Sequence, residues 1–401
     1  MSETADVVVI GGGVSGASIT YALAARGARV TLVEKGALAS GASGRSSALV
    51  RMHYTNEWDA RLAWASFPVF RDWSERMGGP PVFTRTGFLN LVGHAYADHL
   101  RRNVETLRGI GINTVALSPG EVARLQPFVD VEDVGAAAYE PDSGYANPVD
   151  TVAGFARRAR ELGARILEWT TVTRVIRRET RVIGVATDRE PIDAGAVVVA
   201  AGAWAPGLCA ELGVAVPARV KAIDTALVTR PPDLGEPHMS IIDNVQGTYL
   251  RPESGGLTIV GVPCPAWDVD PDHEGTGLGP AAAAEGARLL MHRIPGMEHA
   301  TLARGFRAYD CYSSDRHAIL DRVPGVDGLY LATAFSGSGF KIAPAVGTCM
   351  AELILDGEAK TVDIRAFGLE RFEQGKPLEG PYPYASRADH ALPLSPPGVV
   401  V

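Results

Sequence analysis

The sequence predicts an α/β fold built on a parallel sheet, and three observations lead to this prediction. Residues 7–10 form a short apolar, β-branched run that is typical of a buried parallel strand. A glycine-rich turn and a helical pattern follow at once, and a second strand over 29–33 ends in Glu34. Further buried strand patterns lie far along the chain, at 197–203 and 329–332. We therefore expect the sheet to be assembled from separate pieces of sequence.

The turn has the spacing Gly11-x-Gly13-x-x-Gly16. Gly11 permits a tight turn, Gly13 lets the backbone approach a pyrophosphate, and Gly16 lets the helix over 15–25 pack closely on the strand. The free N–H groups and the positive dipole end of that helix favour phosphate. Glu34 stands where a carboxylate accepts hydrogen bonds from a ribose hydroxyl. This context predicts a Rossmann-type dinucleotide site but leaves the dinucleotide open.

Composition excludes several classes of function. The chain has 401 residues, 38 Lys and Arg against 46 Asp and Glu, and a net charge of −8. Without a basic block, nucleic acid and anionic membranes are not expected partners. Four cysteines in no C-x-x-C pair indicate reduced thiols and no metal site. The N-terminus carries acid where a signal peptide carries base, and no membrane span is convincing, so we expect a cytoplasmic protein.

The middle of the chain alternates between helical and strand patterns. Residues 56–77 read as a helix rich in aromatic residues, in which Pro68 is expected to cause a kink or break. Residues 82–92 alternate toward a strand. Ser118 begins a capping box, and Asn147 followed by proline caps a clear amphipathic helix.

The second half adds strands and one further glycine-rich loop. Strand patterns at 170–175 and 181–187 precede a hairpin over 248–260, and a loop at 335–341 leads into a helix at 343–355. We interpret these elements as two domains. The nucleotide-binding domain is discontinuous, a second domain is inserted into it, and a tail follows; the expected boundaries are 1–78, 141–217 and 305–372 for the first, 79–140 and 218–304 for the second, and 373–401 for the tail.

Together these motifs resemble the flavin-dependent amine and amino-acid oxidase family that includes D-amino-acid oxidase, glycine oxidase and sarcosine oxidase. The resemblance covers residues 5 to about 372. The motifs that carry it are residues 7–34, Ser40-Gly-Ala-Ser43, 142–148, Val199-Ala-Ala-Gly-Ala-Trp204, Asp315-Arg-His-Ala-Ile319 and 334–341. The resemblance implies a Rossmann-type FAD-binding domain and a substrate domain on a mixed α+β sheet, with the flavin ring at their junction.

The resemblance and the residue types together give an expected set of FAD contacts. Short donors in the first loop face the phosphates and ribityl chain, the backbone near Val172 holds the adenine, and the 336–339 loop with its helix stabilises negative charge on reduced flavin. The complete set is Gly11, Gly13, Val14, Ser15, Gly16, Glu34, Lys35, Ser43, Arg45, Ser46, Val172, Ala201, Gly202, Trp204, Gly337, Ser338, Gly339, Phe340 and Lys341.

For the substrate, the resemblance implies that Arg51 and Lys341 jointly hold a carboxylate. An arginine fork with a lysine point charge suits a small carboxylate in a partly desolvated pocket. Tyr249 matches a tyrosine that lines the family's pocket, and Arg251 shares its face of the strand. His53, next to Arg51, is a weaker candidate.

Two departures from the sarcosine-oxidase pattern bear on the chemistry. The position of that branch's flavin-linking cysteine falls close to Ala308, with Cys311 three residues later, so we expect non-covalent FAD. That branch also has a lysine on the second hairpin strand, which is associated with oxygen activation, and residues 257–262 contain none. Reoxidation by molecular oxygen or by another acceptor therefore stays open.

The expected reaction is oxidation of the C–N bond of a small amino acid or N-alkyl amino acid to an imine, with hydride transfer to flavin N5. Two alternatives remain. One is oxidation of a 2-hydroxy acid, for which His53 is the nearby base, and the other is a non-catalytic FAD-binding subunit of a multi-chain amine oxidase. The side chain and stereochemistry of the substrate, the choice between primary and secondary amine, and the oligomeric state are not determined by the sequence.

Overall fold

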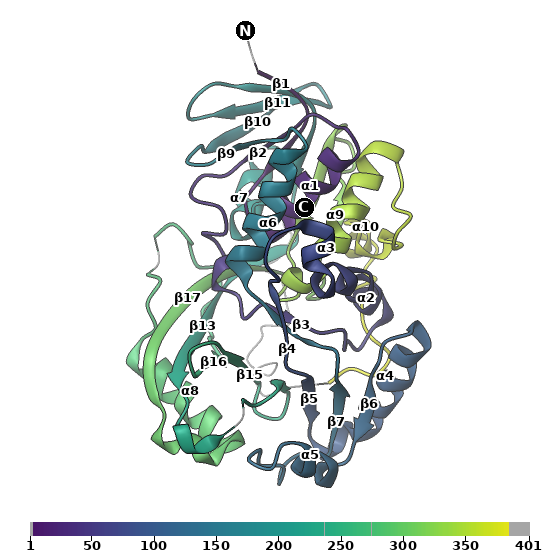
Figure 1. Ribbon diagram of the computed structural model, residues 1–401. Helices are drawn as coiled ribbons and strands as arrows, with labels where there is room; N and C mark the ends of the chain where they lie inside the picture. The colour runs from purple at the N-terminus through teal and green to yellow at the C-terminus, as the bar shows by residue number, and fades with distance from the viewer. Residues whose placement is uncertain (1–2, 236, 274, 385–401) are drawn as a thin grey trace.

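The computed structural model describes residues 3–235, 237–273 and 275–384. Two large sheets lie at opposite ends of the molecule, and a small sheet lies between them (Figure 1). The first sheet contains β1 (Glu3–Ile10), β2 (Val30–Val33), β9 (Arg165–Leu167), β10 (Val172–Arg178), β11 (Arg181–Thr187), β12 (Ile192–Val199), β18 (Ile319–Arg322) and β19 (Leu329–Thr333).

The centre of the first sheet is parallel, as expected. β1 pairs in parallel with β2 and β12, β2 pairs with β9, and β12 pairs with β19. The strands therefore come from distant parts of the chain. β10 and β11 form an antiparallel hairpin that joins β12, and β18 pairs antiparallel with β19.

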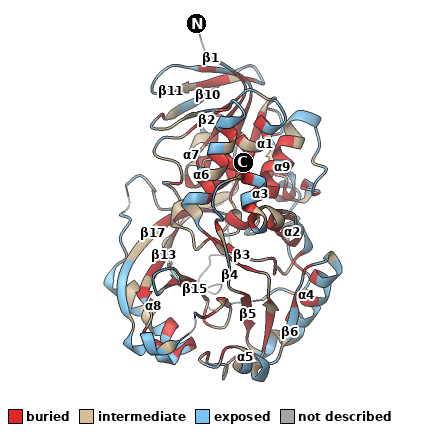
Figure 2. Cartoon of the chain, in the orientation of Figure 1, coloured by how far each residue is buried: buried red, intermediate tan, exposed pale blue. Residues whose placement is uncertain are grey.

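Successive side chains of β1 point to opposite faces of this sheet and pack in two separate core clusters. Val7 and Val9 pack in one cluster with α1 (Val14–Ala25), α6 (Pro148–Glu161) and α9 (Gly339–Asp356), whereas Val8 and Ile10 pack on the other face with α7 (Ala205–Ala210). Figure 2 colours much of α1 and α9, which cover this sheet, as buried. A strand buried on both faces explains the unbroken apolar run in its sequence.

The second large sheet is mixed. Its strands are β5 (Phe88–Val92), β6 (Val115–Leu117), β7 (Ala136–Glu140), β13 (Ala218–Thr229), β14 (Ser240–Asp243), β15 (Thr248–Glu253), β16 (Leu257–Val262) and β17 (Thr301–Ser313). Every neighbouring pair is antiparallel except β14 with β5. The helices α4 (Ala97–Ile110), α5 (Pro119–Leu125) and α8 (Pro280–Arg293) accompany it.

β17 refines the expected domain division. It pairs with β13 over its whole length to Ser313, so the second sheet extends past residue 305, where we placed a boundary. The division into two domains otherwise stays a prediction. Of the expected tail, residues 373–384 are described and 385–401 lie outside the described residues.

The small sheet contains the strand that directly precedes Arg51, a predicted substrate-binding residue. It consists of β3 (Leu49–Val50), β4 (Phe83–Arg85) and β8 (Gly144–Ala146), with β8 between the other two. Arg51 follows β3 directly. β3 and β4 of this small sheet lie between the two large sheets (Figure 1).

Three local expectations differ from the structure. Pro68 lies inside α2 (Glu57–Arg71), and the break before α3 (Trp73–Met77) comes later, at Asp72. Phe67 and Phe70 are buried in the core cluster that contains α9, and this packing holds the helix together across the proline. Residues 82–92 form two strands because the chain turns at Gly87, whose φ is +72°. α9 begins at Gly339 rather than at 343.

Other local expectations are confirmed. Ser118 and Glu121 form the predicted capping box, and the Asn147 side chain accepts hydrogen bonds from two N–H groups of α6. Residues 248–253 and 257–262 form the predicted hairpin. The short final helix α10 covers Glu370–Glu373. Among the described residues, no helix is both long enough and apolar enough to cross a membrane.

Candidate functional site

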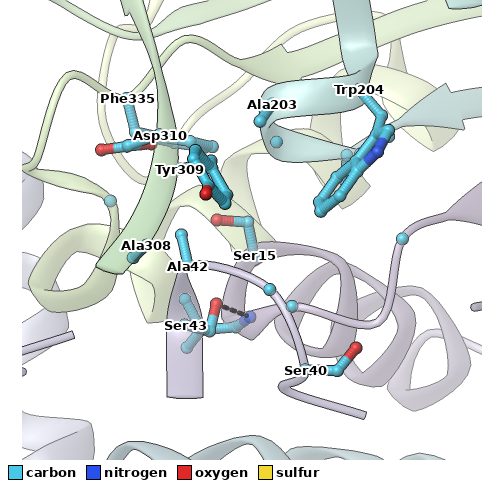
Figure 3. Close-up of a pocket in the computed structure, with 18 of the residues that line it drawn as sticks. Ser15, Ser40, Ala42, Ser43, Ala203, Trp204, Ala308, Tyr309, Asp310 and Phe335 are labelled. Atoms are coloured by element: carbon cyan, nitrogen blue, oxygen red, sulfur yellow. Dashed lines mark hydrogen bonds between the residues drawn. The ribbon is translucent and has the colours of Figure 1, made fainter. Parts of the chain in front are cut away.

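A cavity of about 400 Å³ runs along the carboxyl ends of the parallel strands toward the second sheet. Figure 3 shows Ser15, Ala42 and Ser43 on one side of it, Trp204 at one end, and Tyr309 and Asp310 of β17 opposite. Ligands of open α/β sheets bind at this edge of the strands. The lining residues from the expected cofactor set are Gly11, Gly13, Val14, Ser15, Glu34, Lys35, Ser43, Arg45, Ser46, Val172, Ala201, Gly202, Trp204, Gly337, Gly339 and Phe340.

The glycine turn has the close approaches that its spacing predicts. Gly11 has a φ of +108°, and a Cβ there would come within 2.5 Å of the Ala200 carbonyl oxygen. Gly16 does not line the cavity, but a Cβ there would lie 1.9 Å from the Gly11 carbonyl oxygen. Its smallness therefore lets α1 pack against the turn, so the N-terminus of α1 faces the cavity.

Ser43 completes the first turn of α1 from a distant loop. Its Oγ accepts a hydrogen bond from the Val14 N–H at 2.9 Å (Figure 3). Arg45 donates to the carbonyl oxygens of Ser40 and Gly41, which closes the loop around the cavity. The helix end, the hydroxyls and this guanidinium together fit a phosphate-bearing group.

Glu34 lies at the predicted ribose position, at the end of β2. Its two carboxylate oxygens accept hydrogen bonds from the Gly12 N–H at 2.6 Å and from the Gly36 N–H at 2.8 Å. Each oxygen retains acceptor capacity for a further hydrogen bond. Nearby, the Lys35 ammonium lies 3.9 Å from the Trp204 ring centroid and pairs with Asp272, a lining residue that we did not expect.

The far end of the cavity is formed by the loop before α9. Gly337, Gly339 and Phe340 line it, whereas the Ser338 hydroxyl donates to the Phe335 carbonyl oxygen within the loop itself. Asp310 holds this loop, because its carboxylate accepts from the Gly337 N–H at 2.8 Å. Burial raises the pKa of the Asp310 carboxyl above its usual value. The hydrogen bonds that it accepts from the Cys311 and Gly337 N–H groups act in the opposite direction and offset part of this rise.

These observations test whether the residues fit the expected dinucleotide. A Cβ at Gly11 would meet the Ala200 backbone, and one at Gly16 would meet the Gly11 carbonyl oxygen. The N-terminus of α1 together with Arg45 provides the donors for a pyrophosphate. Glu34 after β2 and Gly337 in the loop before α9 both line this one cavity. The residues present therefore fit FAD in an extended conformation.

A second, smaller cavity adjoins the first. Its volume is about 100 Å³, well below the roughly 300 Å³ at which sites for drug-sized ligands begin. Both cavities are lined by Ser46, Ser47, Tyr249, Gly337 and Phe340. Arg51 and Lys341 line the small cavity together, with Leu49 and Ile242 as its apolar wall. Arg51 and Lys341, the two residues predicted to bind the substrate carboxylate, therefore line one pocket beside the cofactor cavity.

The small cavity brings two basic side chains together. Lys341 is only 5% exposed, and burial, reinforced by the positive charge of Arg51, places its pKa well below the usual value. The Lys341 ammonium and the Arg51 guanidinium lie 5.8 Å and 4.6 Å from the Tyr54 ring centroid. The ring face offsets part of the repulsion between the two cations. A carboxylate between them would stabilise both charges.

Tyr249 stands between the two cavities on β15. Its ring lies over Gly261, where a Cβ would come within 2.2 Å of it, and its hydroxyl is 3.2 Å from the Thr225 hydroxyl. Burial raises the pKa of Tyr249, so the phenol keeps its proton at neutral pH. It is therefore available as a hydrogen-bond donor to a ligand.

Two of the residues predicted for the substrate site, Arg251 and His53, line neither cavity in the described part of the chain. Arg251 shares the face of Tyr249 but is turned to Glu253 and lies 4.1 Å from the Tyr145 ring centroid. His53 is buried behind Arg51, and burial with the nearby arginine charge lowers its pKa to about 3. Its Nε2 lies 3.0 Å from the Tyr384 hydroxyl. His53 is thus a neutral, packed imidazole.

Sequence reasoning missed several residues of the site. Asp310, Tyr309 and Tyr312 line the large cavity from β17, and Ile242 lines the small one from β14. Alternation along β17 is a weak signal, since Ala308, Asp310 and Tyr312 share one face of the strand. Nothing local in the sequence indicates that this face is turned toward the nucleotide turn.

The position of Cys311 bears on how the cofactor is held. Ala308 lines the large cavity, whereas Cys311 is 1% exposed and packs in the core beneath the first sheet with residues such as Cys209. Burial raises the pKa of the Cys311 thiol to about 12. No group of three or more potential metal ligands occurs among the residues that the structure describes.

The comparisons with known proteins agree with this geometry. A family model described as FAD dependent oxidoreductase matches residues 6–353. Glycine oxidase of Geobacillus kaustophilus is 27% identical, over 92% of this chain and 98% of its own. Sarcosine oxidase subunit beta of an Arthrobacter species is 28% identical, over 92% of this chain and 91% of its own.

Among solved structures, L-proline dehydrogenase from P. horikoshii superimposes with a TM-score of 0.86 at 29% identity. The match covers 94% of this chain and all of that one. The Rossmann-type domain and the mixed second sheet are thus shared with solved members of the family. The family model covers most of the chain, and the cavity fits the cofactor that the model names. This chain belongs to the family of FAD dependent oxidoreductases, and FAD is its cofactor.

Proposed function

We propose that this protein oxidises the C–N bond of a small amino acid or N-alkyl amino acid to an imine. The observation that carries the proposal is the pairing of Arg51 and Lys341 in a cavity of about 100 Å³ beside the FAD cavity. Two cations in so small a pocket suit the carboxylate of a small acid. Each charge-assisted hydrogen bond is worth roughly 1.5–3 kcal/mol.

The protein's own groups bind and orient the substrate. Arg51 and Lys341 hold its carboxylate, and the remainder of the molecule is directed past Tyr249 toward the shared wall of the two cavities. Tyr249, which retains its proton, donates a hydrogen bond to the substrate. FAD, held by the glycine turn and the loop before α9, would supply the two-electron oxidation of the C–N bond. Water then hydrolyses the imine.

The names of the relatives support an amine. Sarcosine and proline are secondary amines and glycine is a primary one, and each is a small amino acid. Oxidation of a 2-hydroxy acid would need a base for the hydroxyl proton. His53, the candidate for that base, is packed behind Arg51 with its Nε2 engaged by Tyr384, which favours the amine over the hydroxy acid.

Further parts of the proposal concern the cofactor and the setting. FAD is held non-covalently, because Ala308 faces it and Cys311 is buried as a protonated thiol. The acceptor that reoxidises FAD is molecular oxygen or another redox partner. All four cysteines are free, which suits the reducing cytoplasm.

The test is to mix the FAD-loaded protein anaerobically with glycine, sarcosine, L- and D-proline, and lactate, and to record flavin absorbance. Loss of the oxidised flavin band with one or more amino acids and not with lactate is expected. Bleaching by lactate alone would establish the hydroxy-acid reaction instead, and no bleaching by any amine would favour a non-catalytic subunit. Repeating the reaction in air with a peroxide assay identifies the acceptor.

A further inference from the structure

Residues 376–384, which we term the strap, pack closely against the loop that follows Arg51. The Leu378 N–H donates to the Asp315 carboxylate at 3.0 Å, and the same carboxylate is bound by Arg371 through both oxygens. Gly380 lies against Thr55, because a Cβ at Gly380 would come within 2.0 Å of the Thr55 carbonyl oxygen. This close contact fixes the path of the strap over the loop.

The strap ends on His53 through Tyr384. Their rings are nearly parallel, at 8°, with centroids 6.0 Å apart, and the Tyr384 hydroxyl is 3.0 Å from His53 Nε2. The Asn103 side-chain N–H₂ donates to the Tyr384 hydroxyl and to the Tyr382 carbonyl oxygen, both at 2.8 Å.

The Tyr384 hydroxyl is held from two sides. Its oxygen accepts a hydrogen bond from Asn103, and it forms a second hydrogen bond with His53 Nε2. His53 is neutral, because burial and the charge of Arg51 lower its pKa to about 3. Tyr384 therefore fixes the orientation of the His53 ring.

His53 in turn contacts the Arg51 guanidinium. The His53 carbonyl oxygen accepts a hydrogen bond from Arg51 Nη1. The intervening Met52 N–H donates at 2.9 Å to Glu140, which is fully buried. The backbone over 51–53 is thus held by Glu140 on one side and by Tyr384, through the His53 ring, on the other. The His53 carbonyl therefore holds the guanidinium of an arginine that lines the small cavity.

We propose that Tyr384 is a positioning residue for substrate binding, which acts through His53 to hold Arg51 in the orientation that receives the substrate carboxylate. This inference rests on the proposed function, in which Arg51 and Lys341 bind that carboxylate. A guanidinium binds a carboxylate with two parallel hydrogen bonds only when its plane is correctly oriented. If the Arg51 guanidinium is less firmly oriented, the protein binds the substrate carboxylate more weakly. Once substrate is bound, the geometry of hydride transfer to FAD stays largely unchanged.

The experiment measures the dissociation constant of acetate for the FAD-loaded protein, from the change in flavin absorbance. Acetate presents a carboxylate and cannot be oxidised at a C–N bond. Tyr384→Phe keeps the stacked ring and removes the hydroxyl. It is expected to weaken acetate binding about 5- to 10-fold, the loss of one hydrogen bond. The KM of the amino-acid substrate should rise by the same factor, with kcat changed less than about twofold.

Two controls separate positioning from a general structural effect. Tyr382→Phe removes from the same strap a hydroxyl that accepts a hydrogen bond from Arg102 at 3.5 Å at the surface, and it should leave acetate binding unchanged. Binding of neutral acetamide should be equal in the wild type and in Tyr384→Phe. A double variant tests whether Tyr384 acts through Arg51. In an Arg51→Gln background, Tyr384→Phe should not weaken acetate binding any further.

The outcomes distinguish this inference from the proposed function. If Arg51→Gln loses acetate binding while Tyr384→Phe binds acetate normally, the role of Tyr384 is wrong and the carboxylate site stands. The same holds if Tyr384→Phe weakens acetate and acetamide alike, or if its effect adds fully to that of Arg51→Gln. If Arg51→Gln binds acetate as the wild type does, the proposed carboxylate site is wrong, and the role of Tyr384 is wrong with it.

Discussion

The FAD cavity and the small cavity lined by Arg51 and Lys341 share a wall but are built by different means. The FAD end is formed largely by backbone, with the turn at Gly11, Gly13 and Gly16 packed against the next strand. The small cavity is formed by side chains that converge from distant segments, Arg51 after β3, Tyr249 on β15 and Lys341 on α9. One region is therefore sensitive to the addition of a methyl group, and the other to the removal of a charge.

The largest effect is expected at the backbone-built end. Gly11→Ala places a Cβ 2.5 Å from the Ala200 carbonyl oxygen at a φ of +108°, so the turn must open. We expect FAD affinity to fall by at least 100-fold, measured by titrating the cofactor-free protein with FAD. Gly27→Ala is the matched control. Its φ is +84° but nothing lies within 4 Å, so it should cost only about 1 kcal/mol of stability and leave FAD affinity unchanged. Equal FAD affinity in both variants would show that the turn does not carry the cofactor.

A smaller effect is expected at the charge-built end. Arg51→Gln and Lys341→Met should each raise the dissociation constant of acetate roughly 10- to 100-fold, since each removes one charge-assisted hydrogen bond. The FAD content of the protein should stay the same. Lys360→Met, at a lysine 61% exposed, is the control and should bind acetate normally. If both site variants bind acetate as the wild type does, Arg51 and Lys341 do not form a carboxylate-binding site.

The charge of Lys341 also predicts a dependence on pH. Burial and Arg51 lower its pKa in the free site, whereas a bound carboxylate favours the charged form and raises it. Acetate should therefore bind most tightly below the free-site pKa. Affinity should fall as pH rises through it, by up to about tenfold per pH unit. Lys341→Met should abolish this dependence, which a titration of acetate affinity against pH checks; the same slope in the variant would assign the titration to another group.

The smallest effect is expected at Cys311. Because its thiol is buried and Ala308 faces the cavity, Cys311→Ala should leave flavin content and spectrum unchanged. In the wild type, acid precipitation should release all of the flavin into the supernatant. A yellow pellet from the wild type and a colourless one from the variant would identify Cys311 as a covalent attachment point.

The same contrast explains what the sequence could predict. The strand, glycine turn and helix at residues 7–25, and the caps at Ser118 and Asn147, depend on neighbours within a few positions, and the sequence predicts them well. The helix break expected near Pro68 comes later, at Asp72, and α2 continues through the proline with Phe67 and Phe70 packed in the core.

Contacts across the sequence could not be predicted in this way. Arg51 and Lys341 were paired through the family resemblance rather than through any local pattern. Asp310 at the 336–338 loop, Glu140 at Met52 and Tyr384 on His53 each join segments that only the folded chain brings together. For His53, the sequence indicated a possible base, whereas burial in the fold makes it a neutral support.

Trp204 gives the molecule an optical property of its own. Its indole lines the FAD cavity (Figure 3). It also lies against the Lys35 ammonium and donates a hydrogen bond to Asp272 at 2.9 Å. A flavin that enters this cavity comes close enough to absorb the energy that an excited indole emits. The intrinsic fluorescence of the protein therefore reports cofactor occupancy, and loading can be followed in real time without a label.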